Sequence, residues 1–217
     1  MPTERKIDVA AAAAADRAKA GKSPGAAAAT GVSAKEVEEF SAHCVYIRSV
    51  YTFAVRVFKD IDEAEAEAME AVAPVSYKNM SMVLSEFLVN AACRITEPAA
   101  DRFGNENLTL QLFVNSFAPD SDAYKLLEPL RQRIDTFRKK IVLARNKLAA
   151  HADRVVILKG EPLATASWAE WDDFWSALRD FVRILNEKTT GKRFEIDVPA
   201  MRDEAETLLK ALHDPPT

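Results

Sequence analysis

The chain has 217 residues, of which 48% are hydrophobic and 29% charged, the composition of an ordinary globular protein. Its 6 glycines are too few for the tight turns of a β-sandwich or barrel, and its 2 cysteines exclude a disulfide scaffold. The formal net charge is −4, so a nucleic-acid partner would need a local basic patch. No stretch approaches the roughly 18 consecutive apolar residues of a membrane helix. We expect a cytoplasmic protein with no membrane partner.

The sequence divides into a low-complexity start and a patterned remainder. Residues 1–32 are rich in alanine and carry several glycines, so they bury too little apolar surface to offset their ordering entropy. We predict a disordered tail over 1–32, a helical domain over 33–213 and a short C-terminal tail over 214–217.

The first half of the domain shows two long helical patterns. Ser33 and Glu36 form a capping-box pattern. Apolar residues then recur at steps of three and four: Val37, Phe40, Cys44, Ile47, Tyr51, Ala54 and Phe58. The stretch 80–95 is apolar on more than one face and predicts a central buried helix that ends before Pro98. The acidic run of residues 60–70 predicts a solvated helix or connector, 101–105 a loop, and 108–117 a short helix.

The second half shows the clearest pattern. Steps of three and four again join Leu127, Leu130, Ile134, Phe137, Ile141, Ala144 and Leu148, with Pro129 placed near the start of the predicted helix. Residues 155–158 predict an extended connector. A second capping box, Ser167 with Glu170, opens a helix, and Pro199 opens a last one with Met201, Ala205, Leu208 and Leu212 on its apolar face. The fold class is therefore all-α, an up-and-down bundle of four to five helices.

Metal-ligand and nucleophile motifs are absent from the sequence. It has no HExxH, ExxH or CxxC, its three histidines are far apart, and no GxSxG is present. We therefore expect no metal and no cofactor. His43 and Cys44 are expected at core or boundary positions rather than as ligands.

The segment from Arg131 to Arg154 is the most basic part of the chain. Its eight positive and two negative residues give a local charge of +6, within a chain of −4 overall. Such a concentration suits a polyanion, although a solvated helix face has the same composition.

Inside this segment lies Arg145-Asn146-Lys147-Leu148-Ala149-Ala150-His151. Histidine transfers protons near neutral pH, and arginine binds two phosphate oxygens at once. RNA supplies its own nucleophile, the 2′-OH. Arg145, Asn146 and His151 are thus candidate catalytic residues for metal-free phosphodiester cleavage.

The spacing of the two key residues constrains how they meet. Six residues of α-helix rise about 9 Å and rotate a net −120°, so Arg145 and His151 on one rigid helix would not face one phosphate. Either the helix unwinds before His151, or a two-fold dimer joins two motifs in one groove, which we favour.

The sequence RNKLAAHADR resembles the R-x(4–6)-H signature of the HEPN superfamily, in particular its abortive-infection U-type (AbiU-like) branch with an R-[DN]-K-x-x-A-H-x-D core. Arg145, Asn146, Lys147, Ala150, His151 and Asp153 match that core. The resemblance covers roughly residues 35–213. It implies a HEPN-like bundle, a homodimer, metal-independent endoribonuclease activity, and roles in phage defence or toxin–antitoxin systems.

These expectations assign roles to particular residues. His151 acts as general acid or base, Arg145 stabilises the phosphorane and Asn146 orients them. Four basic residues hold the RNA backbone: Lys139, Lys140, Lys147 and Arg154. Glu97 is a possible accessory residue, since such bundles sometimes place an acidic side chain toward the groove.

Two other functions stay open. The chain is alternatively a non-catalytic module that binds RNA, a nucleotide or a partner such as a nucleotidyltransferase antitoxin, or it is a plain helical dimerisation domain. Base stacking by Trp168, Trp171 and Trp175 is also open, but core packing is favoured for all three.

Overall fold

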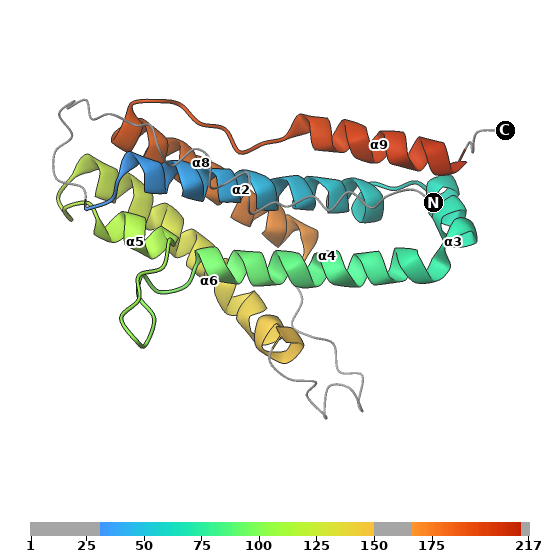
Figure 1. The fold of residues 1–217 in the computed structure, drawn as a ribbon, viewed down its shortest axis with the longest axis horizontal. Coiled ribbons are helices and arrows are strands. Elements are labelled where there is room, and N and C mark those ends of the chain that lie inside the picture. Colours follow the sequence, from blue (N-terminus) through green and yellow to red (C-terminus); the bar gives the residue numbers. More distant parts are fainter. Residues whose placement is uncertain (1–30, 150–165, 214–217) are drawn as a thin grey trace, which may run out of the picture.

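The computed structural model describes the backbone of residues 31–149 and 166–213. It describes the burial of side chains for residues 31–146 and 166–212. These residues form seven α-helices and one π-helical segment in an all-α bundle (Figure 1). In chain order they are α2 (Ala34–Ala54), η2 (Val55–Lys59), α3 (Glu63–Val72), α4 (Pro74–Ile95), α5 (Leu110–Asn115), α6 (Asp122–Ala149), α8 (Trp168–Thr190) and α9 (Pro199–His213). The predicted all-α class is confirmed, and the short helices α3 and α5 raise the number above the predicted four to five.

Some predictions fall outside the described residues. These are the disordered tail up to residue 30, the connector at 155–158, and the tail at 214–217. Val32, at the end of the predicted tail, is buried against the core. None of the described helices has both the length and the apolar character that crossing a bilayer requires.

Three of the described helices begin with complete capping boxes. At the start of α2, the Ser33 hydroxyl accepts from the backbone N–H of Glu36, whose carboxylate accepts from the N–H of Ser33. Ser167 and Glu170 do the same for α8, as predicted from the sequence. Asp62 and Glu65 cap α3, so most of the acidic run of residues 60–70 is helical. Each box satisfies N–H groups that a helix start leaves without partners.

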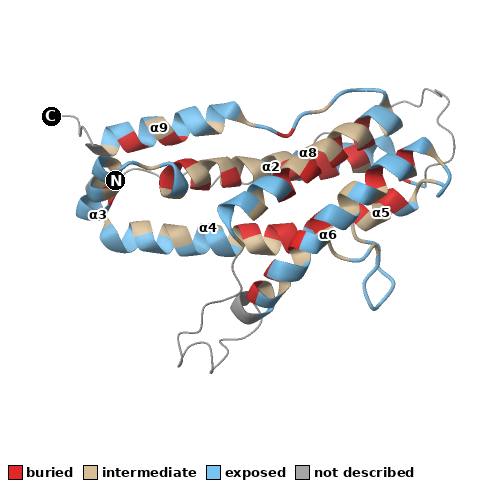
Figure 2. Ribbon diagram, turned by 180° about the vertical axis from the view of Figure 1, so that it is seen from behind, coloured by how far each residue is buried: buried red, intermediate tan, exposed pale blue. Residues whose placement is uncertain are grey.

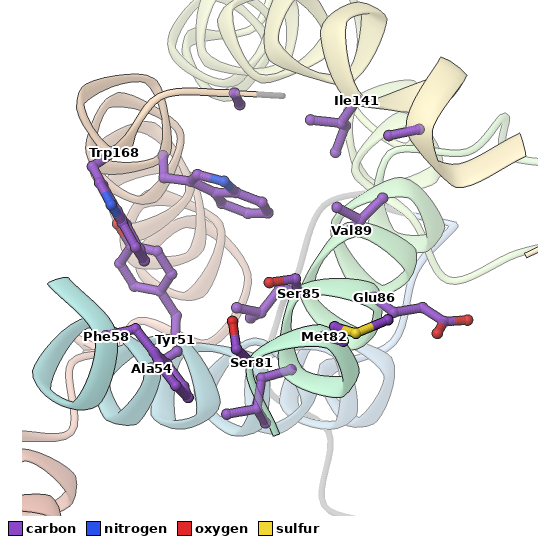
Figure 3. Close-up of a pocket in the computed structure, with 15 residues that line it drawn as sticks. Tyr51, Ala54, Phe58, Ser81, Met82, Ser85, Glu86, Val89, Ile141 and Trp168 are labelled. Carbon is purple, nitrogen blue, oxygen red and sulfur yellow. The ribbon is translucent and has the colours of Figure 1, made fainter. Parts of the chain in front are cut away.

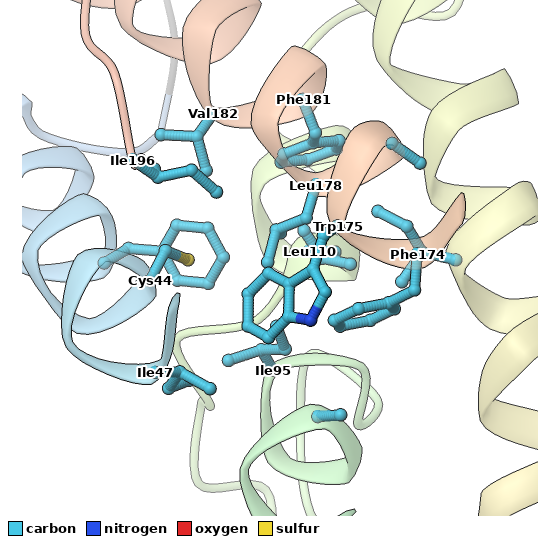
Figure 4. Close-up of a cluster of buried hydrophobic side chains, with 14 of the residues drawn as sticks. Cys44, Ile47, Ile95, Leu110, Phe174, Trp175, Leu178, Phe181, Val182 and Ile196 are labelled. Atoms are coloured by element: carbon cyan, nitrogen blue, oxygen red, sulfur yellow. The ribbon is translucent and has the colours of Figure 1, made fainter. Parts of the chain in front are cut away.

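One hydrophobic core joins α2, α4, α5, α6 and α8 (Figures 2 and 4). α2 buries the predicted face from Val37 to Ala54. Opposite it, α8 buries an aromatic and aliphatic face that includes Phe174, Trp175 and Leu178. Ile196, in the segment between α8 and α9, closes the core beside Cys44 and Val182 (Figure 4).

The π-helical segment η2 changes which residues are buried at the end of α2. Val57 is fully buried there and Arg56 nearly so, whereas Phe58, predicted on the buried face, is half-buried and stacks on Tyr77 of α4. Val57 belongs to a second, smaller cluster with Met69 of α3 and Ala205 and Leu209 of α9. This cluster attaches α3 and α9 to the far end of α2.

The prediction of a central buried helix over residues 80–95 is wrong for the first half of α4. Leu88 and Ile95 are buried, but Met82 and Val83 are each 62% exposed. α4 packs mainly against α6, then against α2 and α3. Its first half extends beyond the crossing with α6 and forms one side of the bundle (Figures 1 and 2).

Two details of the later helices also differ from prediction. α6 begins at Asp122, so Pro129 lies inside the helix rather than near its start. In α9 the buried residues are Ala205 and Leu209, and Leu208, predicted on the apolar face, is 41% exposed.

Candidate functional site

The end of α6 is joined to the end of α4 by an ion pair. Arg145, four residues before the end of α6, donates through Nη2 to Oε1 of Glu97 at 2.9 Å. Glu97 follows α4 by two residues, after Thr96 has ended that helix by bonding back to Ala92 and Cys93. The Arg145 side chain is 36% exposed and that of Glu97 is 28% exposed, so the pair is accessible from solvent. Glu97, expected as a possible accessory residue, therefore contacts the arginine of the motif.

The other motif residues are placed only in part. Asn146 is exposed on α6. The Lys147 side chain, His151 and Arg154 lie outside the described residues, and α6 is described as far as Ala149. The geometry between Arg145 and His151 therefore remains a prediction.

Arg138 precedes Arg145 by seven residues on α6 and was not predicted as a site residue from the sequence. Seven residues of α-helix return to nearly the same face, about 10 Å along the axis. Both guanidinium groups lie near the buried Cys93, whose pKa is raised by burial, an effect that the two arginines partly oppose. The Arg138 Nε is buried without a hydrogen-bond partner. The seven-residue spacing of Arg131, Arg138 and Arg145 is the sequence signal that could have identified it.

Part of the positive charge of α6 is matched by carboxylates on other parts of the bundle. Toward α8, Arg133 bonds to Asp173 and Lys140 bonds to Glu170. Hydrogen bonds from Lys140 and then from Ser167 lower the pKa of Glu170 to about 2. Hydrogen bonding from Arg133 likewise lowers the pKa of Asp173.

The remaining basic residues of α6 differ in how strongly they are paired. Arg131 binds Glu128 through two hydrogen bonds of 2.6 and 2.7 Å. Lys139 is 74% exposed and lies 3.8 Å from Asp135, a weak contact. Among the basic residues of α6 whose surroundings are described, Lys125 and Arg138 are the two with no carboxylate within 4.0 Å. Within the described residues, four of the positive charges counted in the sequence are therefore paired with carboxylates: Arg131, Arg133, Lys140 and Arg145.

A cavity of about 430 Å³ lies between α2, α4, α6 and α8 (Figure 3). Trp168 and Trp171 of α8 and Tyr51 of α2 form one wall, and Ser81 and Ser85 of α4 form another. The prediction of core packing for all three tryptophans is confirmed for Trp175, which is 2% exposed, but Trp168 is 39% exposed.

Clusters of metal ligands are not found in the described part of the chain. Within residues 31–149 and 166–213, no three His, Cys, Asp or Glu side chains are placed to hold a metal ion. His43 is an exposed residue of α2 whose pKa is lowered by partial desolvation and then by nearby Arg94. Cys44 is fully buried, and burial raises the pKa of its thiol.

Comparison with known proteins supports one family. The sequence model of the HEPN family AbiU2 matches residues 34–191, more than half of the chain. The match contains the whole RNKLAAH segment and ends at Gly191, so α9 lies beyond it, whereas the resemblance was expected to reach 213. Neither a curated protein nor a solved structure matches the chain. The chain belongs to the AbiU2 family of HEPN proteins.

Proposed function

We propose that the protein is a metal-independent endoribonuclease of the HEPN type that acts in phage defence or as a toxin. Family membership carries the proposal, because the matched residues 34–191 include an intact RNKLAAH segment. The protein works as a cytoplasmic homodimer, since two copies deliver an arginine and a histidine to one phosphate where a single helix does not.

The proposed reaction uses the RNA's own nucleophile. The 2′-oxygen forms a bond to the adjacent phosphorus, and the bond from phosphorus to the 5′-oxygen breaks. His151 of one copy takes the 2′-OH proton, and the second copy's histidine gives a proton to the leaving 5′-oxygen. The products are a 2′,3′-cyclic phosphate and a 5′-hydroxyl. Arg145 stabilises the negative charge on the phosphorane oxygens.

The contact between Arg145 and Glu97 supports this role for the arginine. A guanidinium has five N–H donors in a fixed plane, and Glu97 takes one of them. The other donors remain for phosphate oxygens, while the carboxylate fixes the direction of the side chain. Glu97 acts as a positioning residue, and Asn146 orients the reacting groups.

The basic residues differ in how well they support the proposed RNA contacts. Lys139 is largely exposed and only weakly paired, which suits a phosphate contact. Lys140 is bonded to Glu170, so binding RNA would break an ion pair within the protein. Lys147 and Arg154 are proposed RNA contacts on the sequence alone.

The test is cleavage of RNA by the purified protein in EDTA. We expect wild type to release 2′,3′-cyclic phosphate ends and His151→Ala to be inactive. His43→Ala is the matched control, because His43 is an exposed histidine of α2 outside the motif. Equal cleavage by wild type and His151→Ala, or no cleavage of any RNA tested, would falsify the catalytic claim.

Two arginine variants test the same site independently of His151. Arg145→Ala should abolish cleavage, whereas Arg193→Ala, which removes an exposed arginine paired with Glu195, should leave it unchanged. A sizing measurement should give the mass of two chains. A monomer that cleaves RNA would contradict the shared site.

The ion pairs of α6 favour a second candidate, a non-catalytic module. Carboxylates on Glu170, Asp173 and Glu128 reduce the field that would attract a polyanion. Such a module would bind RNA or a protein partner, for example a nucleotidyltransferase antitoxin. It predicts a partner that binds wild type and His151→Ala equally well.

A further inference from the structure

We propose that the cavity between α2, α4, α6 and α8 binds an unpaired nucleobase of the RNA, next to the end of α6 that carries Arg145. The inference rests on the proposed function and names a substrate subsite for it. The cavity measures about 430 Å³, within the 300–1,000 Å³ range of small-molecule sites. The cavity is open to solvent, because exposed residues line it, among them Ser85 and Glu86 of α4 and Trp168 of α8.

One wall of the cavity is aromatic. The ring of Tyr51 lies 5.8 Å from that of Trp171 and 6.2 Å from that of Trp168, measured between centroids. Trp168, the first residue of α8, is 39% exposed, so part of its indole ring is accessible to a ligand. Aromatic faces of this kind stack on bases of any sequence.

The aromatic wall is held in place before any ligand arrives. The Tyr51 hydroxyl donates to Asp172 of α8 at 2.9 Å. Lys59 also donates to Asp172, at 3.2 Å, and its ammonium lies 5.8 Å from the centre of the Trp168 ring. These contacts fix the rings between α2 and α8, so stacking a base requires little further ordering.

The facing wall offers free hydroxyl groups. Ser81 and Ser85 lie one turn apart on α4 and point into the cavity (Figure 3). Helical hydroxyls elsewhere in the bundle, such as those of Thr52 and Thr96, donate to a backbone carbonyl of the preceding turn. Neither Ser81 nor Ser85 has a hydrogen bond to any described residue of the chain. Each hydroxyl can therefore donate to or accept from the edge of a base whose face stacks on the indoles.

The cavity lies close to the proposed cleavage site. Ile141 and Ala144 of α6 line it, and Arg145 is the next residue. Ile141 precedes Arg145 by about 6 Å along the helix axis. A base turned into the cavity would therefore belong to a nucleotide near the cleaved bond. The mostly apolar lining favours an unpaired base over a phosphate or sugar, which would lose hydration there.

The experiment measures RNA binding in the inactive His151→Ala background, with tryptophan fluorescence and anisotropy of short single-stranded RNAs. Trp168→Leu should weaken binding about tenfold. Trp168→Phe, which keeps an aromatic face, should restore most of it. The salt dependence of binding should not change, because stacking releases no counterions.

The hydroxyls are tested by the double variant Ser81→Ala with Ser85→Ala. In the active protein it should change which bases are preferred beside the cleaved bond. Ser76→Ala, an exposed serine of the same helix outside the cavity, is the matched control. Alanine favours helix, so loss of α4 would not explain a change.

Each outcome decides the proposal. Unchanged binding by Trp168→Leu overturns the subsite, and if wild type still cleaves RNA, the proposed function stands without it. Nucleoside monophosphates that bind as tightly as RNA would make the cavity a free-nucleotide site and overturn the RNA assignment. Trp168-dependent RNA binding by a wild type that cleaves nothing supports the subsite and overturns the ribonuclease. No RNA binding at all overturns both.

Discussion

Arg145 and Glu97 are 48 residues apart in sequence, yet 2.9 Å separates Nη2 of one from Oε1 of the other. The pair fixes the last turns of α6 against the end of α4. Without the Glu97 carboxylate, Arg145 keeps its place on α6, but this hydrogen bond no longer orients its guanidinium group.

Glu97→Gln should therefore lower kcat for RNA cleavage by at least about tenfold while leaving KM unchanged, because misdirected catalytic groups are costly and Glu97 itself binds no RNA. The free energy of unfolding should fall by less than about 1 kcal/mol, since the pair is partly exposed. Steady-state kinetics and urea unfolding measure the two effects. Glu195→Gln, which breaks an exposed pair with Arg193, is the control. A normal kcat in Glu97→Gln would remove Glu97 from the mechanism.

Arg56 makes the most buried ion pair between side chains of the described residues. It donates to both carboxylate oxygens of Glu65, at 2.5 and 2.9 Å, and to the carbonyl of Asp60. Arg56→Met removes two charge-assisted hydrogen bonds from a nearly buried pair whose side chains are 11% and 16% exposed, so the free energy of unfolding should fall by about 3 kcal/mol. Arg202→Met, which removes a 47% exposed arginine, should cost less than about 1 kcal/mol. Equal losses in the two variants would show that burial does not decide the cost.

Glu170 should make the protein sensitive to acid. Its pKa is lowered from 4.5 to about 2 by the hydrogen bond from Lys140 and by Ser167. A lowered folded-state pKa contributes stability that is complete above pH 4.5 and is lost as the pH falls toward 2. Glu170→Gln should flatten the stability curve in this window, as measured by thermal unfolding at each pH. Glu204→Gln, an exposed carboxylate of α9, should leave the slope unchanged. An unaltered slope in Glu170→Gln would rule out this linkage.

Pro129 lies inside α6 and is exposed. Proline there removes a backbone hydrogen bond to the preceding turn and crowds its carbonyl. Pro129→Ala should raise the free energy of unfolding by about 1–3 kcal/mol. Lys125→Ala, an exposed position on the same helix, should change it by less than about 0.5 kcal/mol. Destabilisation by Pro129→Ala would mean that a bend at this position is needed for packing.

The helical faces could be predicted where a single stripe of apolar residues is present. Val37, Phe40 and Cys44 on α2 recur at helical spacing and are all buried. The capping pairs at Ser33 and Ser167 were equally clear, because both partners lie within one turn. Local spacing is enough to define such features.

Other features depend on which elements meet, and local spacing does not contain that information. Val83 and Leu88 of α4 are both apolar, but only the second is covered by neighbouring helices. The charge of α6 was read from its own residues, whereas Asp173 neutralises Arg133 from 40 residues away. In the site, Arg145 and Glu97 could each be chosen as candidates from the sequence, but the ion pair between them could not be predicted.

The three capping boxes have a consequence for how the family can vary. Ser33, Asp62 and Ser167 each fix the rotational phase of a helix from within its own first turn. Insertions or deletions in the connection before such a serine or aspartate therefore do not rotate the packed face that follows. Homologous chains should accordingly differ in length just upstream of these three positions while keeping the spacing from each cap to its first core residue constant.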